Sequence, residues 1–424
     1  MTLDETEARR LGLRANWRQF ALLVVVNAFV GAMVGLERSV LPTLAEEEFG
    51  LANRTVILSF LITFGVVKAG TNYFAGRLSD RIGRKPVLLL GWLAALPVPV
   101  MIILAPSWGW VVAANVLLGI NQGLAWSTTV IMKIDLVGPV RRGFAMGLNE
   151  TAGYAGVALA SLATGYLAAA YGPRPAPFLL GIGFAVLGLL LTVLFVRETH
   201  EHARLEASQS AVEDPDDKPG GREIFLRTSF TDRNLSSVSQ AGFVNNLNDG
   251  MAWGLFPLFF AVAGLSIGQI GVLAAVYPGV WSIGQLVTGW ASDRLGRKWM
   301  IASGMWLQAA GILLIAATQS FASWTVGAIL MGLGTALVYP TLLAAIGDVA
   351  HPSWRASAVG VYRLWRDSGY AVVAVLAGVV ADLFGFIPAI IVVGILTALS
   401  GLVVAVRMRE TLVRRQVEQS MADG

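Results

Sequence analysis

The sequence contains no cysteine, only three histidines and little charge. The absence of cysteine excludes disulfide bonds, thiolate metal sites and cysteine nucleophiles. The histidines, His200, His202 and His351, leave few groups for a metal centre or a general base. Charged residues make up 14% of the chain, whereas a soluble domain carries about a quarter. The composition therefore argues against a water-soluble globule, and we expect neither a metal site nor a cofactor.

Two further classes of protein are disfavoured. The formal net charge of +4 suits nucleic-acid binding, but a protein with many membrane spans needs cytoplasmic Lys and Arg in any case. The sequence also shows no P-loop, no nucleophile–base set and no pair of catalytic carboxylates. We therefore expect a protein of the lipid bilayer that is not an enzyme and does not bind nucleic acid.

Apolar runs dominate the chain, which is 55% hydrophobic. A transmembrane helix needs about 20 apolar residues, so 424 residues have room for twelve. We predict an all-α membrane protein with twelve transmembrane helices, arranged as two six-helix bundles. The predicted spans are residues 19–44, 55–77, 86–105, 109–135, 143–170, 176–196, 236–262, 268–290, 298–318, 322–348, 356–382 and 386–406.

Basic residues gather in alternate loops and set the predicted orientation. They follow the second, fourth and eighth spans and the last span, whereas the opposite loops hold only Arg54 and Arg174. Because positively charged loops stay in the cytoplasm, both termini are expected there, in a multi-pass protein of the inner (plasma) membrane. Four arginines before the first span indicate a retained flank rather than a cleavable signal peptide; they are Arg9, Arg10, Arg14 and Arg18.

One long polar loop divides the chain. Residues 200–232 are charged and contain the breaker Pro219-Gly220-Gly221, which predicts a solvated cytoplasmic linker. The expected parts are an N-terminal half, 1–199, the linker, 200–232, and a C-terminal half, 233–424. His200 and His202 lie in this linker, where solvated histidines are more common than metal ligands.

The two halves repeat one pattern. Gly76-Arg77-Leu78-Ser79-Asp80-Arg81-Ile82-Gly83-Arg84-Lys85 recurs 213 residues later as Gly289-Trp290-Ala291-Ser292-Asp293-Arg294-Leu295-Gly296-Arg297-Lys298. The register continues downstream, since Asp135, Pro139 and Arg142 correspond to Asp348, Pro352 and Arg355. Six spans per half give both halves the same orientation, related by an axis along the membrane normal. A cavity between two such halves can open to either side by rocking, which favours a transporter over a receptor.

These motifs resemble those of the major facilitator superfamily (MFS). The G-x-L-x-D-R-x-G-R-K loop resembles the signature loop of that superfamily, and the D-x-x-x-P-x-x-R segment from Asp135 to Arg142 is also similar. With the span count and the central linker, the resemblance covers essentially the whole chain. It implies the MFS fold and a secondary transporter that works by alternating access on a small-molecule substrate.

The acidic residues of the repeated loops need a partner. Asp80 and Asp293 end their helices, where the helix dipole disfavours an anion, and the free N–H groups at another helix N-terminus would stabilise them. The resemblance implies span 11 as the partner of Asp80 and span 5 as the partner of Asp293. Arg81 is then expected to bind Asp135, with the equivalent pair in the second half.

We interpret this set as a latch that holds the cytoplasmic side shut; the alternative is a simple topology anchor. The glycines permit the tight turn and close helix approach. The predicted latch residues are Gly76, Asp80, Arg81, Gly83, Arg84, Asp135, Asp293, Arg294, Gly296, Arg297 and Asp348, with Arg294 as the expected partner of Asp348. Gly289 is the repeat counterpart of Gly76.

Several ionisable residues fall inside predicted spans, where they face a partner or a wet cavity. Glu150 and Asp249 are the candidate proton carriers, and Arg363 and Arg366 are candidates to bind an anionic substrate group. Glu150 and Arg363 are equivalent in the repeat. Lys68 and Asp367 have similar expected depths and are predicted to pair. Static ion pairs that only orient helices are the alternative.

Three further charges lie near span ends. Lys133 is expected near the cytoplasmic interface, where a long side chain can reach water. Glu37 and Arg38 lie toward the outer end of span 1, and either an extracellular position or a role in the lumen fits them.

Spans 1, 4, 7 and 10 line the cavity in this superfamily, which implies that their polar residues meet substrate. Such groups are costly against lipid, so a polar lumen is required independently. The candidate cavity residues are Asn115, Asn121, Gln122, Trp126, Asn245, Asn248, Trp253 and Tyr339, together with Arg363 and Arg366. Aromatic residues among them can equally serve packing.

The chain departs from the drug–proton antiporters of the superfamily in two places. They usually carry an Arg in span 4 four residues before a Gly, where this chain has Asn115 before Gly119, and a Gly-Pro-rich motif in span 5, where it has no interior proline. We predict a monomeric secondary transporter with proton-coupled export. The alternatives are an organic-anion symporter or uniporter that uses Arg363 and Arg366, and, more remotely, a non-transporting membrane sensor.

Overall fold

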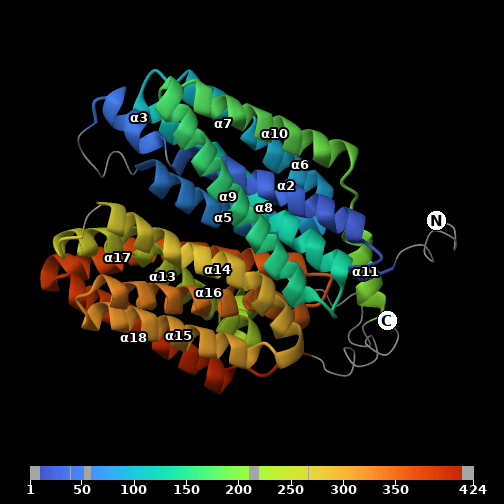
Figure 1. Ribbon diagram of the computed structural model, residues 1–424. Helices are drawn as coiled ribbons and strands as arrows, with labels where there is room; N and C mark the ends of the chain where they lie inside the picture. Colours follow the sequence, from blue (N-terminus) through green and yellow to red (C-terminus); the bar gives the residue numbers. More distant parts are fainter. Residues whose placement is uncertain (1–9, 39, 52–58, 210–218, 266, 413–424) are drawn as a thin grey trace. The chain divides into compact units, whose positions relative to one another are not determined.

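The computed structural model describes residues 10–38, 40–51, 59–209, 219–265 and 267–412. These residues form helices joined by short connections, with no strand among them (Figure 1). The chain divides into two compact units. Unit 1 comprises Met1–Gly138, Asn149–Lys218 and Pro352–Gly360, and unit 2 comprises Pro139–Leu148, Pro219–His351 and Val361–Gly424. Each unit thus joins most of one sequence half to a short segment of the other half.

Unit 1 contains the helices of the first half. Their bounds are α2 Trp17–Arg38, α3 Leu41–Glu47, α5 Ser59–Ile82, α6 Arg84–Ala95, α7 Pro97–Ile103, α8 Trp108–Val137, α10 Ala176–Leu194 and α11 His200–Gln209. Helix α9, Arg142–Tyr171, begins in unit 2 and belongs to unit 1 from Asn149 onward. Helix α8 packs against α2, α5, α6 and α7, and most of its side chains are buried.

Unit 2 repeats this plan. Its helices are α12 Gly221–Leu226, the π-helical turn η1 Arg227–Thr231, α13 Arg233–Val262, α14 Ile267–Leu295, α15 Lys298–Ala317, α16 Phe321–Val349 and α18 Phe386–Arg407. Helix α17, Arg355–Phe384, begins in unit 1 and belongs to unit 2 from Val361 onward. Helix α16 packs against α13, α14 and α15, so it occupies the place that its counterpart α8 has in unit 1.

Proline residues lie where the helices differ from the expected spans. The first expected span, 19–44, corresponds to two helices, α2, which ends at Arg38, and α3, which begins at Leu41 with Pro42 in its first turn. The third, 86–105, is interrupted at Leu96, because Pro97 begins α7. Proline has no N–H group to continue the preceding helix. The other helices agree with the expected ranges to within a few residues.

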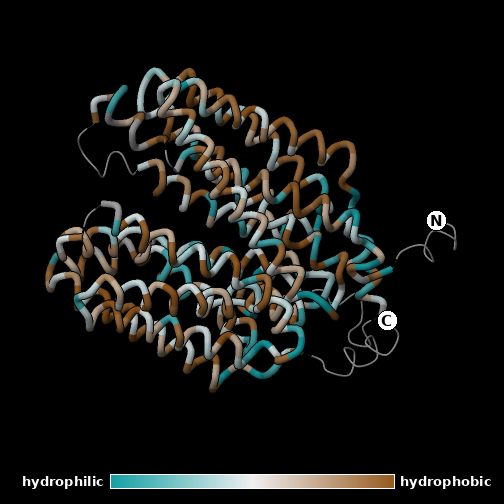
Figure 2. The backbone as a smooth tube through the Cα atoms, viewed as in Figure 1, coloured by the Kyte–Doolittle hydropathy of each residue, from teal (hydrophilic) through white to brown (hydrophobic). Residues whose placement is uncertain are grey.

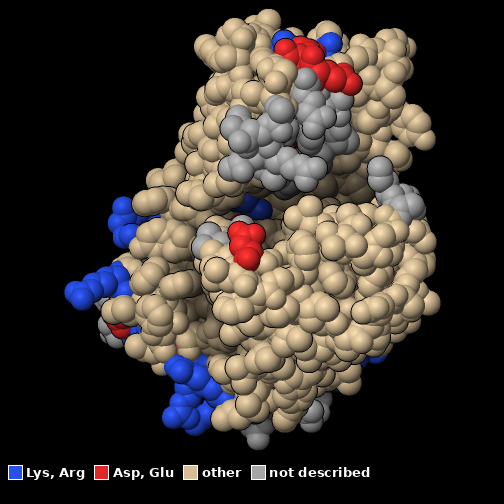
Figure 3. Space-filling view, turned by 90° about the vertical axis from the view of Figure 1, so that its left-hand side faces the viewer, with Lys and Arg blue, Asp and Glu red and all other residues tan. Residues whose placement is uncertain are grey.

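Apolar side chains face outward on many of these helices. Among the described residues, eight helical segments are long and apolar enough to cross a membrane. They are Trp17–Glu37, Arg84–Ile103, Arg142–Tyr171, Ala176–Leu194, Gln269–Leu295, Lys298–Ala317, Phe321–Val349 and Phe386–Arg407. Figure 2 shows hydrophobic residues along α10 and hydrophilic residues around α11. Most of the surface in Figure 3 is neither acidic nor basic, as lipid contact requires.

The linker differs from the prediction of a solvated loop. Residues 200–209 form α11, which buries Ala203 and Glu206. After the linker residues that lie outside the description, Ile224 in α12 and Thr228 in η1 are also buried. Ala203 and Ile224 face protein because an amphipathic helix hides its apolar face, whereas Glu206 is buried by its ion pair with Arg355.

Candidate functional site

The first signature loop turns sharply at a glycine. Helix α5 ends at Ile82, Gly83 has φ +95°, and α6 begins at Arg84. Only glycine adopts this φ without strain. A Cβ atom at Gly83 would also lie 2.7 Å from Oε2 of Glu198, so the absence of a side chain leaves room for that carboxylate.

The turn directs Arg84 into unit 1. Its Nε donates to Oδ2 of Asp135 at 2.9 Å, and its Nη1 donates to the carbonyl oxygen of Ser79 at 3.0 Å. Nη1 also lies 3.6 Å from Oδ1 of Asp80. The expectation that Arg81 binds Asp135 is wrong: Arg81 is exposed in the last turn of α5. The helix has to end before an arginine can turn back toward Asp135.

In unit 2, too, the arginine after the glycine turn binds the aspartate, not the arginine that the sequence indicated. Nε of Arg297 donates to Oδ2 of Asp348 at 3.0 Å, and Nη2 donates to Oδ1 of Asp293 at 2.8 Å. Arg294, the expected partner of Asp348, is instead exposed and stacks 3.9 Å above the ring of Trp290. Gly296, with φ +101°, makes the turn.

The two loop aspartates bind helix N-termini. Oδ2 of Asp80 accepts hydrogen bonds from the backbone N–H of Ser357 at 2.9 Å and from its hydroxyl at 2.7 Å, in the first turn of α17. The carboxylate of Asp293 accepts from the N–H groups of Gly143 at 2.8 Å and Phe144 at 2.9 Å, in the first turn of α9. These are the helices that the resemblance implied. The free N–H groups there suit an anion.

Close backbone approach accompanies each contact. A Cβ atom at Gly76 would lie 2.2 Å from the carbonyl oxygen of Ala356, and one at Gly289 would lie 2.5 Å from that of Gly143. Any larger residue would push these segments apart. The two glycines therefore allow the first turn of α17 to lie close to α5, and the first turn of α9 to lie close to α14.

Sequence reasoning missed the two glutamates of the repeated Arg-Glu-Thr ends. The carboxylate of Glu198 accepts four hydrogen bonds of 2.9 Å, from the backbone N–H groups of Arg84, Lys85, Thr199 and His200. It thereby caps α6 and α11 together. Burial would raise the pKa of Glu198, but these hydrogen bonds outweigh burial and hold the pKa below its ordinary value.

Glu410 has the same arrangement in unit 2. It accepts from the N–H groups of Arg297 at 2.7 Å, Lys298 at 3.3 Å, Thr411 at 2.9 Å and Leu412 at 3.0 Å. The recurrence of Arg-Glu-Thr after 212 residues was the available signal. Its meaning depends on a contact with a loop more than 100 residues earlier, which no local pattern reveals.

Glu150 lies in a buried polar cluster of unit 1. Its Oε1 accepts from Nδ2 of Asn149 at 2.7 Å and from Nε1 of Trp126 at 3.3 Å. Oδ1 of Asn149 accepts in turn from Nζ of Lys133 at 2.6 Å. Lys133 is fully buried, so its side chain does not reach water as expected, whereas its position near the cytoplasmic interface stays a prediction. Lys68 lies beside this cluster, with Nζ 5.6 Å from the centre of the Trp126 ring.

Asp249 lies in a buried polar cluster of unit 2. Its Oδ1 accepts a hydrogen bond from the hydroxyl of Tyr277, and that hydroxyl also lies 3.0 Å from Oγ1 of Thr335. Oδ2 of Asp249 is buried and has no hydrogen-bond partner within the described part of the chain. The carboxyl group is therefore held on one side and open to a proton or a water on the other.

Arg366 joins α17 to α13 and α16 within unit 2. Its Nε donates to Oδ1 of Asn246 at 3.3 Å, its Nη1 lies 3.5 Å from Oδ1 of Asp367, and its guanidinium stacks 4.2 Å above the ring of Tyr339. Arg363 is fully buried one turn earlier. Lys68 belongs to unit 1 and Asp367 to unit 2, so their pairing stays a prediction.

Alternate faces of α13 have different surroundings. Asn246 and Asp249 face the groups just described. Nδ2 of Asn248 donates to Oε1 of Gln308 at 2.8 Å, and Oδ1 of Asn245 accepts from Nε2 of Gln308 at 3.0 Å. The hydroxyl of Thr397 donates to Oδ1 of Asn248 at 2.7 Å. Asn245 and Asn248 therefore bind α15 and α18, and these contacts favour a packing role over the expected substrate contact.

The candidates on α8 also make hydrogen bonds inside their unit. Nδ2 of Asn121 donates to the carbonyl oxygen of Gly91 at 2.9 Å, and Nε2 of Gln122 donates to that of Val30 at 2.8 Å. Asn115 donates to the carbonyl oxygen of Val111 in its own helix at 3.1 Å. These buried amides join α8 to α6 and α2. Glu37, at the end of α2, is also buried, and the side chain of Arg38 lies outside the described residues.

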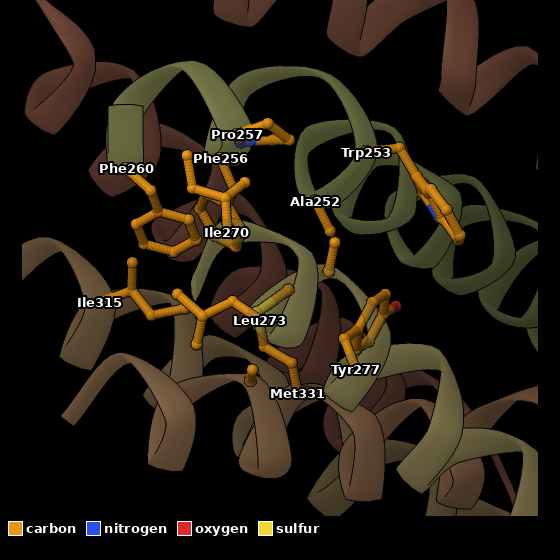
Figure 4. Close-up of a pocket in the computed structure, with 12 residues that line it drawn as sticks. Ala252, Trp253, Phe256, Pro257, Phe260, Ile270, Leu273, Tyr277, Ile315 and Met331 are labelled. Carbon is orange, nitrogen blue, oxygen red and sulfur yellow. The ribbon is translucent and has the colours of Figure 1, made fainter. Parts of the chain in front are cut away.

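Unit 2 also contains an apolar pocket (Figure 4). Trp253 and Tyr277 lie at one end of it and Phe260 and Ile315 at the other. Its lining comes from α13, α14, α15 and α16 and is mostly aromatic and aliphatic; the full set is Ala252, Trp253, Phe256, Pro257, Phe260, Ile270, Leu273, Ala274, Tyr277, Ile315, Ala328 and Met331. Tyr277 connects the pocket to Asp249. Of the expected cavity residues, Trp253 lines this pocket, whereas Asn245 and Asn248 do not.

The repeated loops and the paired helical units agree with a comparison of the whole sequence. The sequence model of the Major Facilitator Superfamily matches residues 21–236 and 238–421. The chain belongs to the Major Facilitator Superfamily. MFS proteins are transporters rather than enzymes, so this chain is a multi-pass membrane transporter for a small-molecule substrate.

The MFS relatives include multidrug resistance proteins named MdtG. MdtG of Proteus mirabilis is 24% identical over 385 residues, which cover 88% of this chain and 91% of the relative. MdtG of Enterobacter lignolyticus is 31% identical over 189 residues, which cover 43% of this chain. There the match spans 44% of the relative, less than half its length.

Solved MFS structures share the fold. The proton:xylose symporter XylE superposes with a TM-score of 0.78 at 14% identity, covering 93% of this chain and 96% of that one. The human organic anion transporter MFSD10 gives 0.74 at 19% identity, covering 91% and 99%. The Escherichia coli fucose:proton symporter FucP gives 0.73 at 15% identity, covering 92% and 98%. At these identities the likeness shows the fold alone.

Proposed function

We propose that this MFS protein is a secondary transporter that exports a small solute in exchange for protons by alternating access. The observation that carries the proposal is the pair of fully buried carboxyl groups, Glu150 and Asp249, on two of its long helices. An ionisable group in a membrane costs several kcal/mol unless it is paired or used. Glu150 and Asp249 each lie beside side chains that hydrogen-bond to the carboxyl group, and this supports proton coupling.

The surroundings of Glu150 suit a group that gains and loses a proton. Its neighbours Asn149 and Trp126 are neutral donors, and the cation of Lys133 donates to the same Asn149. Hydrogen bonds from these donors favour the carboxylate over the carboxylic acid. Protonation would weaken these bonds and so change how α9 and α8 pack, which is the link that coupling requires.

Asp249 is the second proposed carrier. The hydroxyl of Tyr277 can donate to the carboxylate or accept from the carboxylic acid, because a phenol does both. The unpartnered Oδ2 leaves one position for the proton. Since Tyr277 also lines the apolar pocket, a solute there would contact the group that senses the protonation of Asp249.

Export is proposed from the relatives named for multidrug resistance. Four long helices, α5, α8, α13 and α17, are not among the eight apolar segments described above, and they carry most of the buried polar groups. We propose that these four also cross the membrane, which gives twelve transmembrane helices. The basic loops would then face the cytoplasm with both termini, in the inner membrane. The proposed transporting unit is the monomer.

An organic-anion symporter or uniporter is the second candidate. Arg363 and Arg366 are both buried on α17, and a guanidinium suits a carboxylate or phosphate. The neighbour Asp367 already offsets the charge of Arg366, which favours proton-coupled export. A sensor that transports nothing is the remote third possibility, and solute flux separates it from both.

The test begins with thermal shifts of the purified protein against lipophilic cations, carboxylates, phosphates and sugars at two pH values, because a ligand that binds only the folded state raises its stability. The solute that stabilises the protein is then added to proteoliposomes that contain a pH-sensitive dye. Proton-coupled export predicts solute-driven proton flux that is lost in Glu150→Gln while solute exchange at equal pH persists. Uncoupled flux, or stabilisation by anions that disappears in Arg363→Gln, would overturn the proposal in favour of the second candidate.

A further inference from the structure

The two arginines that end the repeated D-x-x-x-P-x-x-R segments have different partners. In unit 2, Nη1 of Arg142 donates to Oδ1 of Asp348 at 3.0 Å. Its counterpart 213 residues later, Arg355, lies in unit 1. There Nη1 and Nη2 donate to the two carboxylate oxygens of Glu206 at 2.8 and 2.7 Å. Glu206 comes from the linker helix α11, His200–Gln209.

The carboxylate that the repeat assigns to Arg355 is available in the same unit. Asp135 is the counterpart of Asp348, and its Oδ2 accepts from Nε of Arg84 at 2.9 Å and from the hydroxyl of Thr199 at 3.0 Å. Its Oδ1 is buried and has no hydrogen-bond partner among the described residues. In Asp348 the equivalent oxygen binds Arg142. Glu206 therefore has the arginine that symmetry would give to Asp135.

The linker helix is fixed at both ends. Glu206 and Arg355 are 8% and 1% exposed, and their two parallel hydrogen bonds form the strong bidentate type. At the other end of α11, Nδ1 of His200 lies 3.0 Å from Nη1 of Arg84. Buried Ala203 lies between them, three residues from each, so one face of the helix makes all three contacts.

We propose that Glu206 is a positioning residue of the transport cycle. It holds the first turn of α17 through Arg355, in the arrangement where Ser357 binds Asp80, and its release frees Arg355 for Asp135. The inference rests on the proposed alternating access, and it makes the linker helix a component that sets how often the Asp80–Ser357 contact opens. The repeat explains the device, because a second carboxylate is ready to receive the arginine.

The absence of native cysteine allows a direct test. Ala358 follows Ser357 in unit 1, its repeat counterpart Ala145 follows Phe144 in unit 2, and both side chains are fully buried. Single-cysteine variants Ala358→Cys and Ala145→Cys of the full-length protein in proteoliposomes are labelled with a membrane-permeant maleimide. We expect Glu206→Gln to accelerate both labelling rates about tenfold, since losing one partner of a buried ion pair shifts an equilibrium by at least that factor.

A control on the same helix separates this effect from a general change of charge. Glu201 also lies on α11 but pairs with Arg204 at 2.8 Å, so Glu201→Gln is expected to leave both rates unchanged. Acceleration at Ala358→Cys alone would show local loosening of residues 352–360, and unchanged rates at both positions would show a passive contact. Either result would overturn the proposal.

Two further variants keep the test decisive if Glu206→Gln folds poorly. Arg355→Gln is expected to accelerate labelling as Glu206→Gln does, and the double variant no further, because the pair acts as one unit. Exchanging the charges, Glu206→Arg with Arg355→Glu, is expected to restore slow labelling. The labelling needs neither solute nor pH gradient, so its outcome is independent of whether Glu150 and Asp249 couple protons.

Discussion

Glu198 accepts hydrogen bonds from the backbone N–H groups of Arg84 and of its own neighbour Thr199, each at 2.9 Å. One carboxylate therefore fixes the start of α6 and the start of α11 in unit 1. The signature loop is built around this acceptor, which lies 114 residues after Arg84 in the sequence.

Replacing Glu198 by Gln is expected to lower the free energy of unfolding by about 1–2 kcal/mol, because hydrogen bonds to a charged acceptor are stronger than those to an amide. Thermal unfolding of the purified protein measures this. Glu410→Gln should give a similar loss in unit 2. Arg197→Gln, at an exposed neighbouring position, should give none, and equal stability of all three variants would contradict the capping role.

The pH dependence of stability should reveal the lowered pKa of His200. Burial, and next to it the positive charge of Arg84, lower the pKa of His200 below its ordinary 6.5. Arg204 acts in the same sense, whereas Glu198 and Asp135 oppose it. At a pH below about 6.5, His200 is protonated in the unfolded chain before it is protonated in the folded protein. The free energy of unfolding therefore falls as the pH decreases below that value.

Glu198 contributes at lower pH in the same direction. Because its pKa lies below the ordinary 4.5, its stabilisation is complete above that value and is lost as the pH falls further. Thermal unfolding followed from neutral pH downward should therefore show a first loss that is absent in His200→Gln and a later loss that remains. A first loss of the same size in that variant would exclude His200 as its source.

Arg84 and Arg81 should behave very differently when each is replaced by Gln. Arg84→Gln leaves Asp135 buried without its cation, which is expected to cost about 3–5 kcal/mol. Arg81→Gln changes an exposed side chain and is expected to stay within about 0.5 kcal/mol. Unfolding in denaturant distinguishes the two, and a larger loss for Arg81→Gln would restore the original prediction.

Gly76 and Gly65 form a matched pair on α5. In Gly76→Ala the added Cβ meets the carbonyl oxygen of Ala356, whereas a Cβ at Gly65 meets open space. We expect Gly76→Ala to lose about 1–3 kcal/mol through overpacking, and Gly65→Ala to gain about 0.5–1 kcal/mol through helix propensity. Faster maleimide labelling of Ala358→Cys should accompany Gly76→Ala only. Equal behaviour of the two variants would contradict the close approach.

Gln308→Leu tests the packing role of Asn245 and Asn248. It removes the acceptor for Nδ2 of Asn248 and the donor to Oδ1 of Asn245, at an expected cost of about 2 kcal/mol or more. The Kd of the transported solute should be unchanged, because these side chains face α15 and α18. An unaltered stability with a Kd weakened about tenfold or more would return Asn245 and Asn248 to the substrate site.

The helices could be predicted from the sequence because each apolar run is long and ends at charge, glycine or proline. The contact of Asp80 with α17 needed the resemblance to a family, since helix physics indicates only that some N-terminus is required. The partner of Asp135 could not be assigned correctly because the sequence does not show that α5 continues to Ile82. Arg81 therefore stays on the exposed surface of α5, whereas Arg84, after the turn at Gly83, points toward Asp135. The faces of α13 also could not be separated, because four polar residues in five surround most of the helix.

The Asp80–Ser357 hydrogen bond joins positions 277 residues apart. During synthesis, the ribosome has therefore made most of the second half before the carboxylate of Asp80 receives its partner. A nascent chain that stops at the linker carries an unfinished unit 1, because Pro352–Gly360 is still missing. Truncated products of this protein consequently leave the carboxylate of Asp80 without the N-terminus of α17 that binds it in the completed chain.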